Sequence, residues 1–183
     1  MNWKICVCSA FLVAAFIAML SNPKVKCRQL FGDFRTIFYD NRTMKPSRFD
    51  IISFFACPVV IGIVIPVGFD FYFSKDVINT LLTIFSILFT FLFGITSLLA
   101  TTANSENSTK ATIIKEAFTA ASFAMLISLI SLVLAIVYQV LLEKISAIPW
   151  FQTLTGVLLA LSSHMIMLFF MLIKRTYVTS TTE

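Results

Sequence analysis

Five apolar segments separated by short polar intervals make up most of this chain, at 5–20, 51–73, 77–100, 117–142 and 151–173. A helix needs roughly 20 apolar residues to cross about 30 Å of hydrocarbon. The last four segments approach or exceed that length, and the first is shorter. The pattern predicts an all-α, polytopic helical membrane protein. We expect four core transmembrane helices, an N-terminal hydrophobic segment and a cytoplasmic amphipathic interfacial helix.

The segments divide the chain into four predicted parts. Residues 1–20 form an N-terminal hydrophobic segment, either a short span or an interfacial one, and 21–50 form a basic amphipathic cytoplasmic segment. Residues 51–173 form a four-helix transmembrane domain, and 174–183 a cytoplasmic tail. The first segment could be a signal peptide, but no small-x-small cleavage site follows it, so we expect it to be retained.

Composition supports a membrane rather than a soluble protein. Of 183 residues, 58% are hydrophobic and 13% charged, and 20 are phenylalanine. These proportions lie outside the range of soluble domains, because so few polar side chains could not cover a core of this size. The four cysteines include no metal-like pair and no disulfide framework.

Basic residues indicate the orientation. The 21–50 interval holds seven of them: Lys24, Lys26, Arg28, Arg35, Arg42, Lys45 and Arg48. Short loops rich in lysine and arginine stay in the cytoplasm. We therefore expect a multi-pass protein of a cell inner membrane, with 21–50 and the C-terminus on the cytoplasmic side.

The 28–42 stretch is amphipathic if it is helical. Its proposed docking residues are an aromatic row and a basic row: Arg28, Phe31, Phe34, Arg35, Phe38 and Arg42. Such a helix lies at a membrane interface, with its arginines toward anionic headgroups or an acidic partner. A topology anchor, a partner-docking surface and a lipid sensor all fit this pattern. Direct binding of nucleic acid is not expected, because the basic residues are scattered and partly offset by acids.

Two spans carry packing signals. Pro58 and Pro66 each remove a backbone donor from the second apolar segment, which predicts either a hinge or a static bend. Small residues recur every three or four positions in the last two segments and predict helix packing or an oligomer interface. These are Ala121, Ala124, Ser128, Ser131, Gly156 and Ala160.

His164 is the most unusual residue in the predicted spans, where ionisable groups are costly and often functional. It could form a pore or gate with Thr83 and Thr90. Alternatively, it is a neutral imidazole that bonds a hydroxyl, such as that of Ser163 across a subunit interface or that of Thr90. One histidine cannot supply a metal site, and no nucleophile motif or phosphate-binding loop is present. We therefore expect no enzyme activity, catalytic residue, metal or cofactor.

The outline resembles a known family. The basic segment before "SRFDIISFF" and the proline-interrupted "ACPVVIGIVIPVGFD" resemble KwaA, the membrane subunit of the bacterial Kiwa anti-phage defence system. The resemblance implies a homo-oligomeric inner-membrane protein that senses phage attack and holds a soluble DNA-binding effector, KwaB, on its cytoplasmic side. It implies no catalytic residues.

Three functions are thus weighed. The preferred one is a non-enzymatic sensor and scaffold that docks a cytoplasmic effector through its basic membrane-proximal face. The alternative is a homo-oligomeric ion channel or holin-like permeabiliser. A small transporter fits less well, since intramembrane carboxylates and an inverted repeat are both missing from the sequence.

Overall fold

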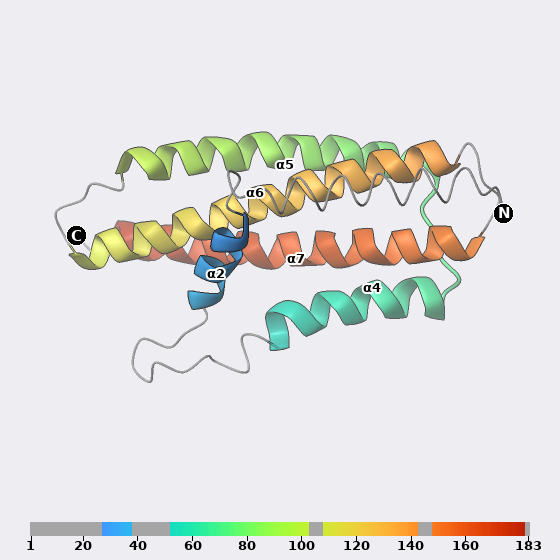
Figure 1. Ribbon diagram of the computed structural model, residues 1–183, viewed down its shortest axis with the longest axis horizontal. Helices are drawn as coiled ribbons and strands as arrows, with labels where there is room; N and C mark the ends of the chain where they lie inside the picture. Colours follow the sequence, from blue (N-terminus) through green and yellow to red (C-terminus); the bar gives the residue numbers. More distant parts are fainter. Residues whose placement is uncertain (1–26, 38–51, 103–107, 143–147, 182–183) are drawn as a thin grey trace.

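The computed structural model describes residues 27–37, 52–102, 108–142 and 148–181 (Figure 1). These residues form helices and no strand. The helices are α2 (Cys27–Thr36), a π-helical turn η1 (Ile52–Ala56), α4 (Cys57–Gly68), α5 (Lys75–Thr102), α6 (Ser108–Leu142) and α7 (Ile148–Thr181). Three of them are long and apolar enough to cross a membrane, and 52–68 is a shorter apolar helix. The chain is an all-α polytopic membrane protein.

The helices lie side by side in the order α5, α6, α7, α4 (Figure 1). Helices α5, α6 and α7 enclose the core, and Phe91 of α5 also stacks on Phe169 of α7, with ring centroids 6.2 Å apart. Helix α4 packs against α7 at the edge of this row. The four apolar helices are therefore a three-helix core with α4 on one side.

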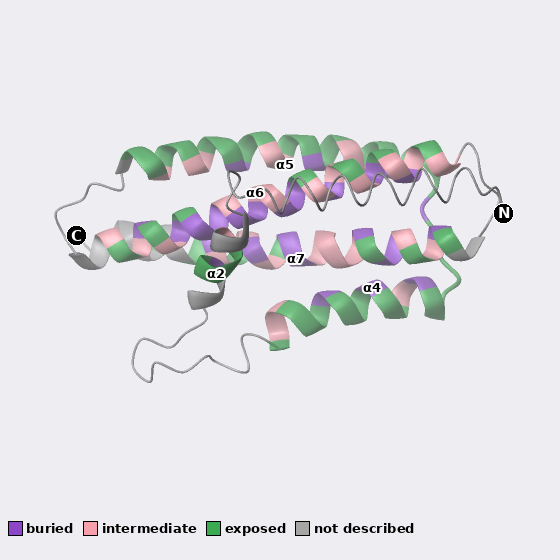
Figure 2. Cartoon of the chain, in the orientation of Figure 1, coloured by how far each residue is buried: buried purple, intermediate pink, exposed green. Residues whose placement is uncertain are grey.

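Helix α6 occupies the centre of the row because its contact face consists of small residues. Ala121, Ala124, Ser128 and Ser131 are all fully buried within the chain. The Ser128 hydroxyl also donates a hydrogen bond to the Phe85 carbonyl of α5, at 3.0 Å. Figure 2 shows buried residues along α6, whereas α5 and α4 expose most of their surface. This predicted stripe is thus used for packing inside one chain.

Two helices extend beyond their predicted limits. Helix α6 begins at Ser108 rather than at 117, and α7 continues to Thr181 through most of the predicted 174–183 tail. The reason is that a helix does not have to end at the point where it leaves the hydrocarbon. The 108–116 stretch contains Lys, Ala and Glu, which favour helix, and no glycine or proline.

Helix α4 is shorter than predicted, because it ends at Gly68 instead of near 73. Asp70 has a φ of 48° and occupies the left-handed position that usually favours glycine. The Phe71 N–H then donates to the Pro66 carbonyl at 3.1 Å, which closes a Schellman-type end. The turn directs the chain into the connection to α5.

The contact between α4 and α7 brings two backbones together. The buried residues of α4 are Pro58, Gly62 and Pro66, and a Cβ added to Gly62 would overlap the Gly156 carbonyl oxygen and lie 2.9 Å from the Ala160 Cβ. A Cβ on Gly156 would likewise overlap the Gly62 carbonyl oxygen. Only small residues allow such a close approach.

Pro66 explains why the Gly62 carbonyl lies at this contact. In an α-helix, this carbonyl would accept from the N–H of residue 66, but proline has none. The carbonyl oxygen lies against Gly156, where a Cβ would overlap it.

We predict that Gly62→Ala and Gly156→Ala each lower the free energy of unfolding by about 1–3 kcal/mol, because the added methyl separates the two helices. Gly94→Ala on α5 is the matched control. A Cβ there meets nothing within 4 Å, so this variant should keep full stability. Reversible unfolding in mixed detergent micelles, followed by circular dichroism, measures both. Equal stability of Gly62→Ala and Gly94→Ala would contradict the close contact.

Candidate functional site

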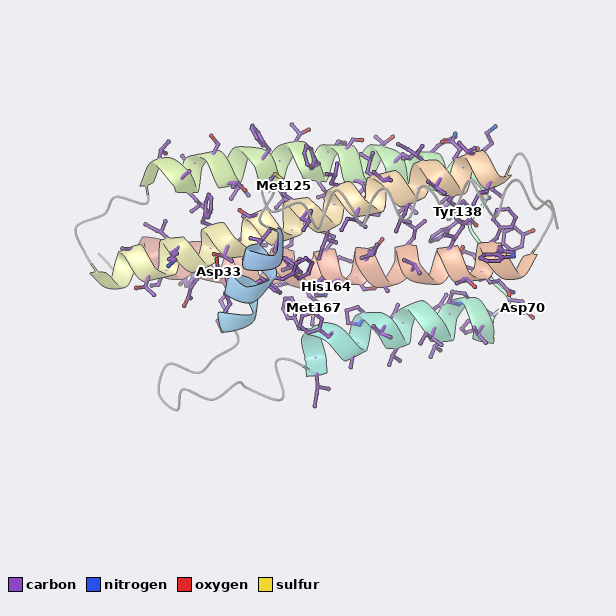
Figure 3. All side chains as sticks on the ribbon, in the orientation of Figure 1. Asp33, Asp70, Met125, Tyr138, His164 and Met167 are labelled. Carbon is purple, nitrogen blue, oxygen red and sulfur yellow. The ribbon has the colours of Figure 1, made fainter. Side chains whose placement is uncertain are left out.

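Four aromatic rings from four different elements, one of them His164, pack together at the place where Figure 3 labels His164. They are Phe34 of α2, Phe54 of η1, Phe123 of α6 and His164 of α7, named here the four-ring cluster. Phe34, Phe123 and His164 are buried, with 2%, 3% and 7% of their surface exposed. Phe54 is half-buried.

The ring contacts form a closed circuit. Phe34 stacks on Phe123 with centroids 3.9 Å apart and ring planes 15° apart. His164 lies edge-on to Phe123 at 6.1 Å and edge-on to Phe54 at 5.3 Å. Phe54 returns to Phe34 at 6.4 Å. Aromatic pairs of this kind contribute about 0.5–1.5 kcal/mol each beyond the area that they bury.

A hydrogen bond joins His164 to η1, the π-helical turn that precedes α4. Its Nδ1 lies 3.0 Å from the Phe54 carbonyl oxygen. A carbonyl only accepts, so Nδ1 carries the proton and donates. In an α-helix, the Phe54 carbonyl would accept from residue 58, which is proline and has no N–H. His164 therefore supplies a side-chain donor to this carbonyl of the π-helical turn. The partner is a backbone carbonyl rather than the predicted hydroxyl of Ser163 or Thr90.

Helix α2 rests on this cluster. Leu30 and Ile37 are partly buried around Phe34, and Phe31 touches Phe123 edge-on at 5.1 Å while remaining half exposed. The predicted amphipathic character holds for this helix, but its most buried aromatic, Phe34, contacts protein rather than lipid.

The basic docking residues are only partly described. Arg28 and Arg35 belong to α2. Phe38 and Arg42 lie outside the described residues, as does the 1–20 segment. Helix α2 ends at Thr36, so the described helix is shorter than the predicted 28–42.

A separate, polar cluster lies where α6 ends and α7 begins, at the place where Figure 3 labels Tyr138 and Asp70. The Tyr138 hydroxyl donates to the Phe73 carbonyl at 3.1 Å and lies 3.2 Å from Thr155 Oγ1. The Phe73 N–H donates to the same Thr155 oxygen at 3.3 Å. This Tyr138 network fixes the α4–α5 connection to α6 and α7. Sequence reasoning missed it, because a tyrosine and a threonine inside apolar runs carry no motif.

The predicted pore residues are not brought together. Thr83 and Thr90 lie on the exposed face of α5 and donate to carbonyls of their own helix, at 3.1 and 3.0 Å. His164 of α7 instead packs against Phe123 of α6 and against Phe54 and Phe55 of η1. Pro58 and Pro66, the predicted hinge, are both buried.

Within the described ranges, no group of three or more His, Cys, Asp and Glu residues is placed to hold a metal ion. Every buried side-chain polar atom in that part of the chain has a hydrogen-bond partner.

Comparisons with protein-family models, curated proteins and solved structures gave no match to this chain. The class of protein thus follows from the fold alone.

We predict that Tyr138→Phe lowers the free energy of unfolding by about 1–3 kcal/mol, because the Phe73 carbonyl loses a buried donor. Thr155→Val should cost a similar amount, and the double variant less than the sum, because both residues belong to one network. Tyr72→Phe, at an exposed tyrosine nearby, is the control and should be neutral. Additive losses would show that Tyr138 and Thr155 act independently.

Proposed function

We propose that this protein is a non-enzymatic membrane scaffold and sensor that docks a soluble cytoplasmic partner through α2 and the basic residues around it. The observation that carries the proposal is the burial of Phe34 against Phe123. A helix tied to the transmembrane core by a stacked aromatic pair is a positioned surface rather than a loose tether.

Such positioning favours binding. A partner that meets an ordered helix does not have to restrict that helix on association, so less of the interaction energy is lost to ordering. The 21–50 interval contributes seven basic residues against three acidic ones, Asp33, Asp40 and Asp50. An acidic patch on a protein, next to anionic lipid headgroups, is the chemistry that this surface complements.

The resemblance to the Kiwa membrane subunits supplies the biological setting of the proposal. In that setting the protein is a homo-oligomer of the bacterial inner membrane with its C-terminus in the cytoplasm. It responds to phage attack and holds a KwaB-like effector. No direct contact with nucleic acid by the membrane subunit is required.

We predict that reversing Arg28, Arg35 and Arg42 to glutamate removes at least about 90% of the co-purifying partner, because like charges now face its acidic surface. Phe34→Ala should also reduce capture of the partner, because α2 loses the ring that packs it against Phe123. The charge-conserving triple Arg→Lys variant is the matched control and should retain the partner.

The measurement is affinity purification of the tagged protein from its native host in mild detergent, followed by native mass spectrometry. A wild-type protein that carries no partner, or a partner unaffected by charge reversal, would refute docking through this surface.

A homo-oligomeric channel is the second candidate, and the exposed face of α5 favours it. Along that face, small and hydroxyl-bearing residues recur alternately every three and every four positions. Ile87 is the exception and occupies one position of this pattern. They are Thr80, Thr83, Thr90, Gly94 and Ser97, all exposed. Parallel copies of α5 around a symmetry axis would place these residues in rings, where close helix approach is sterically allowed.

We predict for this candidate that liposomes containing the protein pass monovalent cations, and that Thr83→Leu with Thr90→Leu reduces the flux at least about tenfold, because apolar rings dewet a pore. Thr153→Leu, the same substitution at an exposed position of α7, should leave the flux unchanged. The absence of flux from wild-type liposomes would dismiss the channel.

A further inference from the structure

Phe54 links two elements that otherwise belong to different parts of the fold. Its ring contacts Phe34 of α2 at 6.4 Å and His164 of α7 at 5.3 Å, and its carbonyl accepts the His164 hydrogen bond. Its backbone leads through η1 directly into α4. The position of Phe54 therefore depends on the start of α4, and α2 packs against Phe54 through Phe34.

A π-helical turn and an α-helical turn place the residues that precede them differently. A π turn holds about one residue more than an α turn, so a change to α register moves the preceding residues by one position, or about 100° around the helix axis. Phe54 would then face away from Phe34 and His164. The α register also leaves the Phe54 carbonyl without a helical donor, because residue 58 is proline. In the π register the donor position is Val59, which has an N–H, so Pro58 favours this register, and the His164 bond to the same carbonyl is made in it.

We propose that η1 and the four-ring cluster form a conformational relay between α4 and α2. In the arrangement of this structure, the His164 hydrogen bond holds η1 in π register and the Phe54 ring packs against Phe34. When α4 shifts along α7, the hydrogen bond breaks, Phe54 rotates out, and α2 loosens from Phe123. Helix α4 is the element placed to move, since it packs at the edge of the row.

The relay acts on the same α2 surface that we propose docks a partner, so its biological use rests on that proposed function. The coupling itself does not, because it is a property of the isolated chain. It also has to be reciprocal: the coupling free energy by which loosening the start of α4 destabilises α2 equals the one by which loosening α2 destabilises the start of α4.

The test is hydrogen–deuterium exchange of the full chain in nanodiscs of phosphatidylethanolamine and phosphatidylglycerol. His164→Phe keeps a ring of similar size but removes the donor. It should speed exchange of the α2 amides at least about tenfold through local opening. Thr155→Val also removes a buried hydrogen bond of α7, but in the Tyr138 network, and should leave α2 exchange unchanged.

The reciprocal arm uses Phe34→Leu, which should speed exchange over 52–60 by a similar factor. Phe54→Leu, which retains the backbone carbonyl, should also loosen α2 and replaces His164→Phe if that variant fails to fold. Faster exchange confined to the mutated element, in either arm, would overturn the relay. No partner is present in these samples, so the result is independent of whether Arg28, Arg35 and Arg42 bind one.

Discussion

Backbone carbonyls that lie four residues before a proline are the constraint on which this fold depends. In hydrocarbon, a polar backbone group has to be satisfied within the protein. Pro58 and Pro66 remove the α-helical donors of the Phe54 and Gly62 carbonyls, which are eight residues apart. On α7, His164 and Gly156 are also eight residues apart, and they face these two carbonyls. The spacing matches because the two helices run antiparallel, so each of these two carbonyls lies against a residue of α7.

This matching connects packing to function. The close glycine contact sets how α4 lies on α7, and the His164 bond brings Phe54 into the cluster on which α2 rests. At the opposite end, the Tyr138 network ties the α4–α5 connection to both neighbouring helices. One end of the row is thus held by hydrogen bonds to a loop. The four-ring cluster, near the middle of α7, is held by ring contacts and by the His164 hydrogen bond.

Much of the fold could be predicted, because hydrophobic length is a strong signal in membrane proteins. Each of the four long apolar segments corresponds to one of the helices α4 to α7, and the amphipathic stretch includes most of α2. Helix limits were less accurate. Residues 108–116 are polar yet helical, and α4 ends early because Asp70 adopts a left-handed conformation that its residue type does not indicate. Hydropathy reports the solvent around a helix and carries little information on where its hydrogen bonding stops.

The sequence by itself determined that this is a helical membrane protein, that His164 is its unusual intramembrane residue, and that Pro58 and Pro66 leave carbonyls in need of partners. These conclusions depend only on residue type and spacing. Tertiary structure alone decided the partner of His164, a backbone carbonyl 110 positions away. It also decided that Phe34 packs on protein and that Thr83 and Thr90 face outward. The physical reason is that any carbonyl looks alike in a sequence, so which donor reaches it depends on how the helices are placed.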